Sequence, residues 1–82
     1  PIQLIELGSR MVRVLIIPGQ QGPVKTPYFA NYPSPLGDSL EKHHGLISEE
    51  ATQKLIDTFK QLKWDLPDNV DLKQFACFAT SG

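Results

Sequence analysis

The chain has 82 residues, a mass of 9.2 kDa and a formal net charge of −1. A folded chain of this mass exposes roughly 4,900 Å² and buries about 63% of its unfolded surface. That size excludes a second core and predicts one domain spanning residues 1–82. Eight basic against nine acidic residues exclude a nucleic-acid binder that works by bulk charge, and the single Cys77 excludes an internal disulfide.

Signals for membranes, cofactors and metals are missing from the sequence pattern. The longest aliphatic run, Val14 to Ile17, has four residues, against the roughly 18 that a membrane span needs. No charged segment leads an apolar one as in a signal peptide. We therefore expect a cytoplasmic protein with no membrane or nucleic-acid partner. Nucleotide, metal and hydrolase motifs are also missing, so we expect no cofactor, no metal and no assigned catalytic residue.

The N-terminal residues predict a β-hairpin. Residues 2–7 and 11–17 are rich in Ile, Leu and Val, and Gly8-Ser9-Arg10 between them is typical of a short turn. The second segment hardly alternates between apolar and polar residues, which is typical of a strand buried on both faces. Pro18 ends it, because proline donates no ladder hydrogen bond.

Residues 18–47 differ in composition, because they contain five of the seven prolines and four of the six glycines. Both residue types disfavour helix and strand interiors, so we expect a long, mostly irregular Pro/Gly-rich loop, a feature that is often functional. One short helix is expected to interrupt it. Asp38 would cap this helix, Glu41 would complete a capping box and Gly45 would end it.

The main helix is predicted over residues 48–64. Ser48 is a good N-cap, Glu49 and Glu50 place negative charge at the positive end of the helix dipole, and Lys63 lies near the other end. An apolar stripe repeats at three- and four-residue steps, formed by Ala51, Leu55, Phe59 and Leu62 with Ile56 beside them. Residues 75–80 favour a strand that follows a turn. The expected fold is α+β, a small sheet covered on one face by one helix.

Aromatic residues and prolines gather in the 18–47 segment and indicate a surface for a protein partner. Tyr is favoured in recognition surfaces because it combines a large apolar ring with a polar tip, and proline keeps such a segment stiff. The alternative is that the rings pack onto the domain as part of its core. We predict a non-catalytic binding protein or accessory subunit that binds a protein partner or self-associates. The predicted contact residues are Lys25, Tyr28, Phe29, Tyr32 and Pro33.

A second hypothesis is a small oligomeric enzyme with acid–base chemistry. Pro1-Ile2 followed by a strand is similar to the start of the tautomerase superfamily, whose β-α-β scaffold carries a catalytic N-terminal proline. The resemblance implies a base at Pro1, with Arg10 or Arg13 holding a substrate carboxylate. Where the family has a long helix after the first strand, residues 11–17 favour a strand. His43 and His44 are the alternative acid–base residues, and Cys77 is expected to be a small buried residue.

Overall fold

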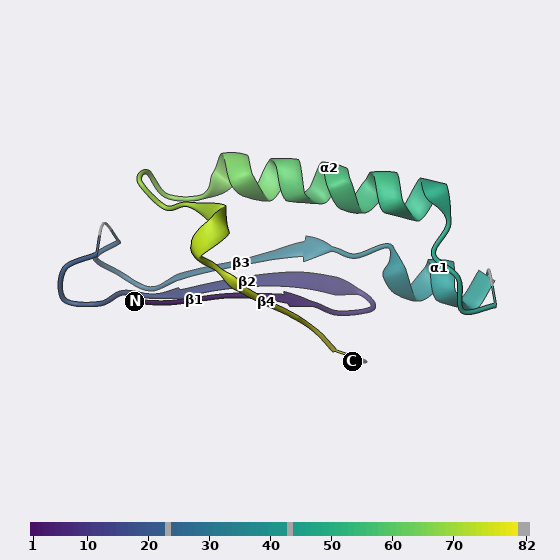
Figure 1. Cartoon of the computed structure of the whole chain (residues 1–82), viewed down its shortest axis with the longest axis horizontal. Helices are drawn as coiled ribbons and strands as arrows, with labels where there is room; N and C mark the ends of the chain where they lie inside the picture. Colours follow the sequence, from purple (N-terminus) through teal and green to yellow (C-terminus); the bar gives the residue numbers. More distant parts are fainter. Residues whose placement is uncertain (23, 43, 81–82) are drawn as a thin grey trace.

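The chain folds into a mixed sheet with one long helix across one face (Figure 1). The computed structural model describes residues 1–22, 24–42 and 44–80. Within them, four strands are ordered β3-β2-β1-β4. The α+β class and the single main helix are as predicted. The elements are β1 (Ile2–Leu7), β2 (Met11–Ile17), β3 (Tyr28–Pro33), α1 (Leu36–Lys42), α2 (Glu49–Asp65), the short 3₁₀ helix η1 (Leu72–Gln74) and β4 (Ala76–Ala79).

Strands β1 and β2 form the predicted hairpin. They pair antiparallel, from Ile2 opposite Ile17 to Leu7 opposite Val12. The amide of Gly8 donates to the Met11 carbonyl oxygen at 2.9 Å and closes the turn. The two segments with the highest β propensity therefore form the centre of the sheet.

Residues 18–47 contain the predicted short helix as α1, but they also contain the strand β3, which was not predicted. From Tyr28 to Tyr32 the side chains alternate between the two faces of the sheet, as the two-residue period of a strand requires. Pro33 is tolerated because it is the last residue of an edge strand. The short helix exists, but it begins at Leu36, so Asp38 lies in its first turn instead of capping it.

Helix α2 begins and ends within one residue of its predicted bounds. The Ser48 hydroxyl accepts a hydrogen bond from the Ala51 amide at 3.1 Å, as expected of an N-cap. Below the helix, fully buried Leu62 packs with Val12 and Val14 of β2 and with Ile5 of β1. This cluster is the centre of the hydrophobic core.

Strand β4 lies parallel to β1 at the edge of the sheet, with Ile5 opposite Cys77 and Leu7 opposite Ala79. All four of its residues are exposed. The expectation of a buried Cys77 was therefore wrong: the thiol is free and exposed, as are the other residues of this edge strand. In Figure 1 helix α2 runs above one face of the sheet.

Candidate functional site

No helix of the described residues lies on the face of the sheet opposite α2 (Figure 1). The strand register assigns alternate residues to it, and several are large apolar side chains with high exposure, including Ile2 (51%) and Phe29 (61%). We call it the uncovered face. Its residues are Ile2, Leu4, Glu6, Met11, Arg13, Leu15, Ile17, Phe29, Asn31, Pro33, Ala76 and Phe78. Soluble monomers rarely leave a contiguous apolar patch of this kind in water unless it binds something.

Strand β2 was predicted to be buried on both faces, and the structure buries only one. Val12, Val14 and Ile16 are fully buried towards α2. On the uncovered face Leu15 is half-buried by its neighbours, and Ile17 keeps 42% of its surface exposed. The chain thus has the sequence of a central layer but supplies a covering layer on one side only.

One ion pair lies at the centre of the uncovered face. Glu6 of β1 and Arg13 of β2 are opposite each other, with Oε1 and Nη1 3.7 Å apart. The Glu6 side chain is 28% exposed and that of Arg13 56%. Such an exposed pair contributes little to stability, typically below about 1 kcal/mol, but it gives the face a polar centre within an apolar surround.

Two of the predicted contact residues, Tyr28 and Tyr32, point away from the uncovered face and towards α2. The Tyr32 hydroxyl donates to Asp65 Oδ2 at 2.7 Å, and the Tyr28 hydroxyl donates to the Asp65 carbonyl oxygen at 3.4 Å. Both rings are half-buried and pack against the core cluster. Partial burial raises the pKa of Tyr32 above its ordinary value, and the hydrogen bond to Asp65 raises it further. These rings therefore belong to the packing between β3 and α2.

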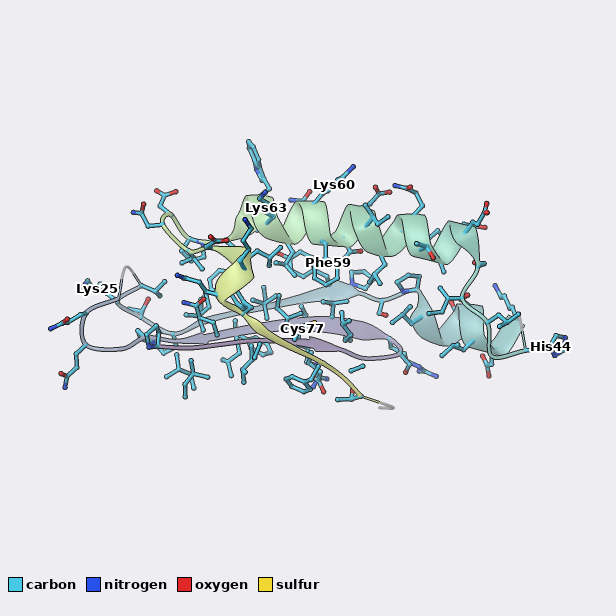
Figure 2. The ribbon with its side chains drawn as sticks, in the orientation of Figure 1. Lys25, His44, Phe59, Lys60, Lys63 and Cys77 are labelled. Atoms are coloured by element: carbon cyan, nitrogen blue, oxygen red, sulfur yellow. The ribbon has the colours of Figure 1, made fainter. Side chains whose placement is uncertain are left out.

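The other three predicted contact residues are exposed but lie apart. Phe29 is on the uncovered face, opposite Leu15. Pro33 ends β3 beside α1, and Lys25 lies in the segment before β3, at the other end of the molecule (Figure 2). The five residues do not form one surface: by register only Phe29 and Pro33, both on the edge strand β3, belong to the uncovered face.

The residues of the acid–base hypothesis are not brought together. Strand β1 leads directly into β2, so the β-α-β order of the tautomerase resemblance is not present. Arg13 is opposite Glu6, about 17 Å along β1 from Pro1 at roughly 3.3 Å per residue, and Arg10 is in the turn beyond. His44 is exposed beyond α1 (Figure 2), at the end of the molecule opposite the N-terminus; His43 lies outside the described residues.

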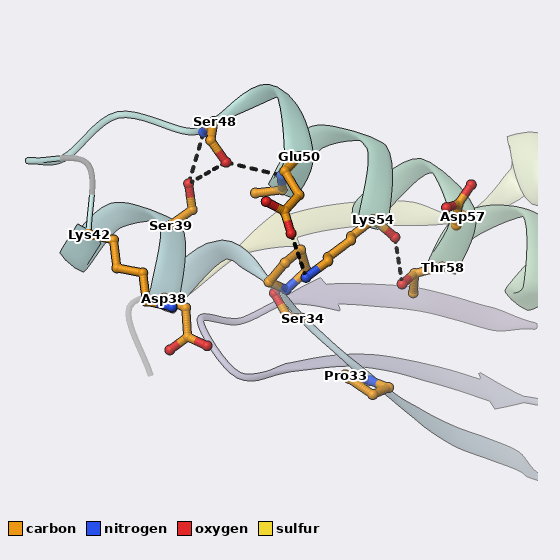
Figure 3. A pocket seen from close by; sticks show the side chains of 12 residues that line it. Pro33, Ser34, Asp38, Ser39, Lys42, Ser48, Glu50, Lys54, Asp57 and Thr58 are labelled. Atoms are coloured by element: carbon orange, nitrogen blue, oxygen red, sulfur yellow. Dashed lines mark hydrogen bonds and ion pairs between the residues drawn. The ribbon is translucent and has the colours of Figure 1, made fainter.

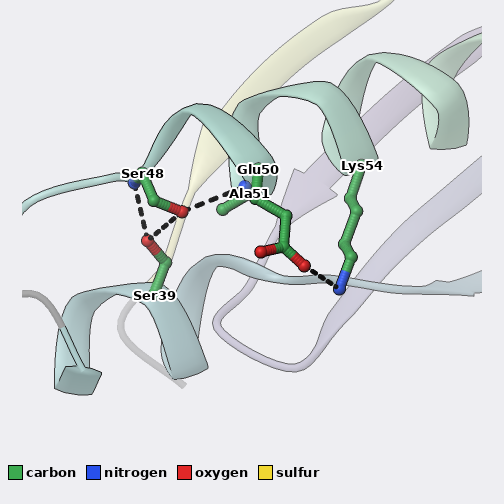
Figure 4. A network of polar contacts seen from close by, with 5 residues as sticks. All are labelled: Ser39, Ser48, Glu50, Ala51 and Lys54. Carbon is green, nitrogen blue, oxygen red and sulfur yellow. Dashed lines mark hydrogen bonds and ion pairs between the residues drawn. The ribbon is translucent and has the colours of Figure 1, made fainter.

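A polar pocket of about 460 Å³ opens between the end of β3, α1 and α2 (Figure 3). Its polar groups mostly satisfy one another. Ser39 accepts from the Ser48 amide at 2.9 Å and donates to the Leu46 carbonyl oxygen at 3.2 Å, and Lys54 pairs with Glu50 at 3.1 Å (Figure 4). The hydrogen bonds of Ser39 thus hold α1 against the start of α2. The pocket is lined by both acidic and basic side chains, which favour no ligand class.

Comparisons with protein-family models, curated proteins and solved structures found no match. Across residues 1–22, 24–42 and 44–80, no group of three or more His, Cys, Asp or Glu side chains is placed to hold a metal ion. In the same residues no helix has the length and apolar character required to cross a bilayer. The chemistry of the surfaces is therefore the evidence for function.

The sequence contained a signal for the uncovered face that the site prediction did not use. The lack of alternation in β2 already required apolar partners on both sides of the sheet. Prediction of the contact surface instead followed the local density of Tyr and Pro, which does not report the direction of a side chain.

Proposed function

We propose that this chain is a small non-catalytic binding protein, an accessory subunit that self-associates through the uncovered face. The observation that carries the proposal is the set of exposed apolar side chains on the uncovered face: Ile2 and Ile17 at the open end of the hairpin, with Phe29 and Phe78 on the edge strands. A second copy supplies the missing layer by stacking its own uncovered face at the roughly 10 Å spacing of packed sheets. The free thiol of Cys77 suits a reducing cytoplasmic location.

The exposed area of the chain supports an incomplete layer. The accessible surface is 5,920 Å², about 1,000 Å² more than the roughly 4,900 Å² typical of a monomer of this mass. A stable interface buries about 800 Å² per partner. The flat footprint of four strands by six residues is on the order of 400 Å² before side-chain relief is counted. The footprint is that of a weak interface, so we expect a dissociation constant on the order of 100 µM.

The ion pair at the centre of the uncovered face makes the face complementary to itself. A two-fold axis brings each residue against a different residue of the partner, and the same contact is then made twice. With Glu6 and Arg13 side by side on neighbouring strands, a stacked pair places each carboxylate near the guanidinium of the other copy. The face thus carries its own complementary charges, which a second copy satisfies without a net charge being buried.

Sedimentation velocity from about 10 to about 500 µM tests the proposal, because it spans the expected dissociation constant. Glu6→Arg or Arg13→Glu alone places like charges together and should weaken association about tenfold. The double variant with both changes restores opposite charges within and between copies, and it should recover association to within about threefold. Phe29→Glu should weaken association more than either single charge variant, because it buries a charge without a partner.

Leu46→Glu is the matched control, since Leu46 is 71% exposed but lies outside the uncovered face. It should associate like the unmodified chain. A chain that stays monomeric at about 500 µM contradicts the proposal. Failure of the charge-swapped double variant to recover, with its melting temperature unchanged, refutes pairing of two copies through this face.

A further inference from the structure

Helix α2 fills only about half of the layer above the sheet. Four strands at about 4.8 Å span roughly 19 Å, whereas one helix is about 10–12 Å across. The hydrogen bonds from Tyr28 and Tyr32 to Asp65 place α2 on the β3 side. At the other edge, Cys77 and Ala79 of β4 point to the same side of the sheet as Ile5 and Leu7, and they are exposed. The short helix η1 fills one end of this space, where Leu72 and Phe75 pack on the core cluster, and the exposure of Cys77 and Ala79 leaves the rest of the layer above β4 open to a second helix.

An apolar groove of about 400 Å³ runs along the side of α2 that faces this space. Ile56 and Asp65 are nine residues apart, which is two and a half helical turns, so their side chains point to opposite sides of α2. Because Asp65 faces β3, the groove side, which includes Ile56, faces away from β3. From Thr52 to Lys63 the groove extends about 17 Å at 1.5 Å per residue. It is lined by Thr52, Leu55, Ile56, Phe59, Lys60, Lys63 and Leu72. Figure 2 shows Phe59 pointing from α2 into the space above the sheet.

The rim of the groove is positively charged. Lys60 and Lys63 line it, no carboxylate does, and in the described part of the chain neither lysine forms an ion pair. The chain as a whole has a net charge of −1, so this positive rim is a local feature. Trp64 does not line the groove but follows Lys60 by four residues, one turn along the same helix, and keeps 85% of its surface exposed.

We propose that this groove binds an amphipathic helix of another protein, with an apolar stripe and acidic flanks. The stripe packs on Leu55, Ile56 and Phe59 as a helix-in-groove contact, and the acidic flank pairs with Lys60 and Lys63. The occupant completes the helical layer over β1 and β4. A second copy does not supply it: α2 already packs its apolar stripe on the core, and α1 has only seven residues.

The proposal does not rest on self-association, because the groove and the uncovered face lie on opposite sides of the sheet. Titrations at about 2 µM protein keep the two apart, since a dimer with a dissociation constant on the order of 100 µM is almost fully dissociated there. The probe is a capped peptide of about 18 residues with Leu at the i, i+3, i+4 positions of a helix and Glu elsewhere. Trp64 is the only tryptophan, so its fluorescence reports binding directly when the probe lacks aromatic residues.

The Glu probe should bind saturably and shift the Trp64 emission to shorter wavelength. A probe with Lys in place of Glu, and a scrambled Glu probe of the same composition, should bind at least about tenfold more weakly, since each loses either the charge or the stripe. Lys60→Glu with Lys63→Glu should weaken binding about tenfold. The matched control is Lys25→Glu with Lys42→Glu, which lie elsewhere and change the net charge equally, from −1 to −5.

Three results would each overturn the assignment. The first is no saturable binding at about 0.5 mM Glu probe. The second is equal binding of the ordered and scrambled Glu probes, which would show bulk charge attraction. The third is equal loss in the two double variants, which would remove the role of Lys60 and Lys63.

Discussion

The orientation of β3 makes a sharp prediction about two aromatic residues of the same strand. Tyr32 faces the helix and Phe29 faces the opposite side. Replacing each with Thr keeps the strand propensity similar while removing the ring. Truncating a fully buried ring costs about 3–5 kcal/mol. For half-buried Tyr32 we take about 2 kcal/mol, with about 1 kcal/mol more for the hydrogen bond to Asp65.

Tyr32→Thr should therefore lower the free energy of unfolding by about 3 kcal/mol, and the melting temperature by roughly 12–24 °C for a domain of this size. Phe29→Thr should change it by about 0.5 kcal/mol or less, as at an ordinary surface site. Tyr32→Phe isolates the hydroxyl and should cost about 1 kcal/mol. Urea denaturation at about 2 µM protein, followed by circular dichroism, measures all three without self-association. Equal stability of the two Thr variants would refute the orientation of the strand.

Three further predictions concern other contacts. Because the folded-state pKa of Tyr32 is raised, the unfolded chain loses that proton first. Stability should then fall as the pH rises above about 10, and Tyr32→Phe should flatten this in urea titrations; an unchanged slope would contradict it. Ser39→Ala should lower the free energy of unfolding by about 1–3 kcal/mol, because it leaves the Ser48 amide and the Leu46 carbonyl without their partner. Ser48→Ala removes an N-cap and should lower it by about 1 kcal/mol. The reverse order in thermal melts would be inconsistent with the observed network. Gly37→Ala should lower the melting temperature, because a Cβ there would lie 2.8 Å from the Ser9 carbonyl oxygen. Gly22→Ala should leave it unchanged, because the nearest atom to a Cβ there is 4.0 Å away. Equal melting temperatures of the two variants would contradict this packing.

Elements defined by local pattern were predictable from the sequence. The hairpin and α2 each combine a strong apolar pattern with end signals a few residues away, such as Gly8 in the turn and Ser48 at the cap. Strand β3 was not predicted, because the proline and glycine count was averaged over thirty residues. The five-residue alternation from Tyr28 to Tyr32 is shorter than that average, and the prolines lie at or beyond its ends.

The candidate surface was harder to predict, because it depends on contacts between distant residues. The pairing of β3 with β2 decides that Tyr28 and Tyr32 face α2 and that Phe29 does not. A register one residue different would exchange the two sets. Composition alone therefore identified an aromatic segment but not its exposed member.

The charges on the two sides of the sheet indicate different partners. The hairpin has apolar residues on both faces, and in the described part of the chain helix α2 covers about half of one face while no helix covers the other. On the uncovered face, Glu6 and Arg13 neutralise each other, so a copy with the same pair is accommodated without net charge. On the side of the sheet that carries α2, Lys60 and Lys63 form a positive rim. Within its described residues, a second copy of this chain has no unpacked acidic helix with which to neutralise that rim. Because the sheet separates the two surfaces, each can be removed by substitution while the other is retained.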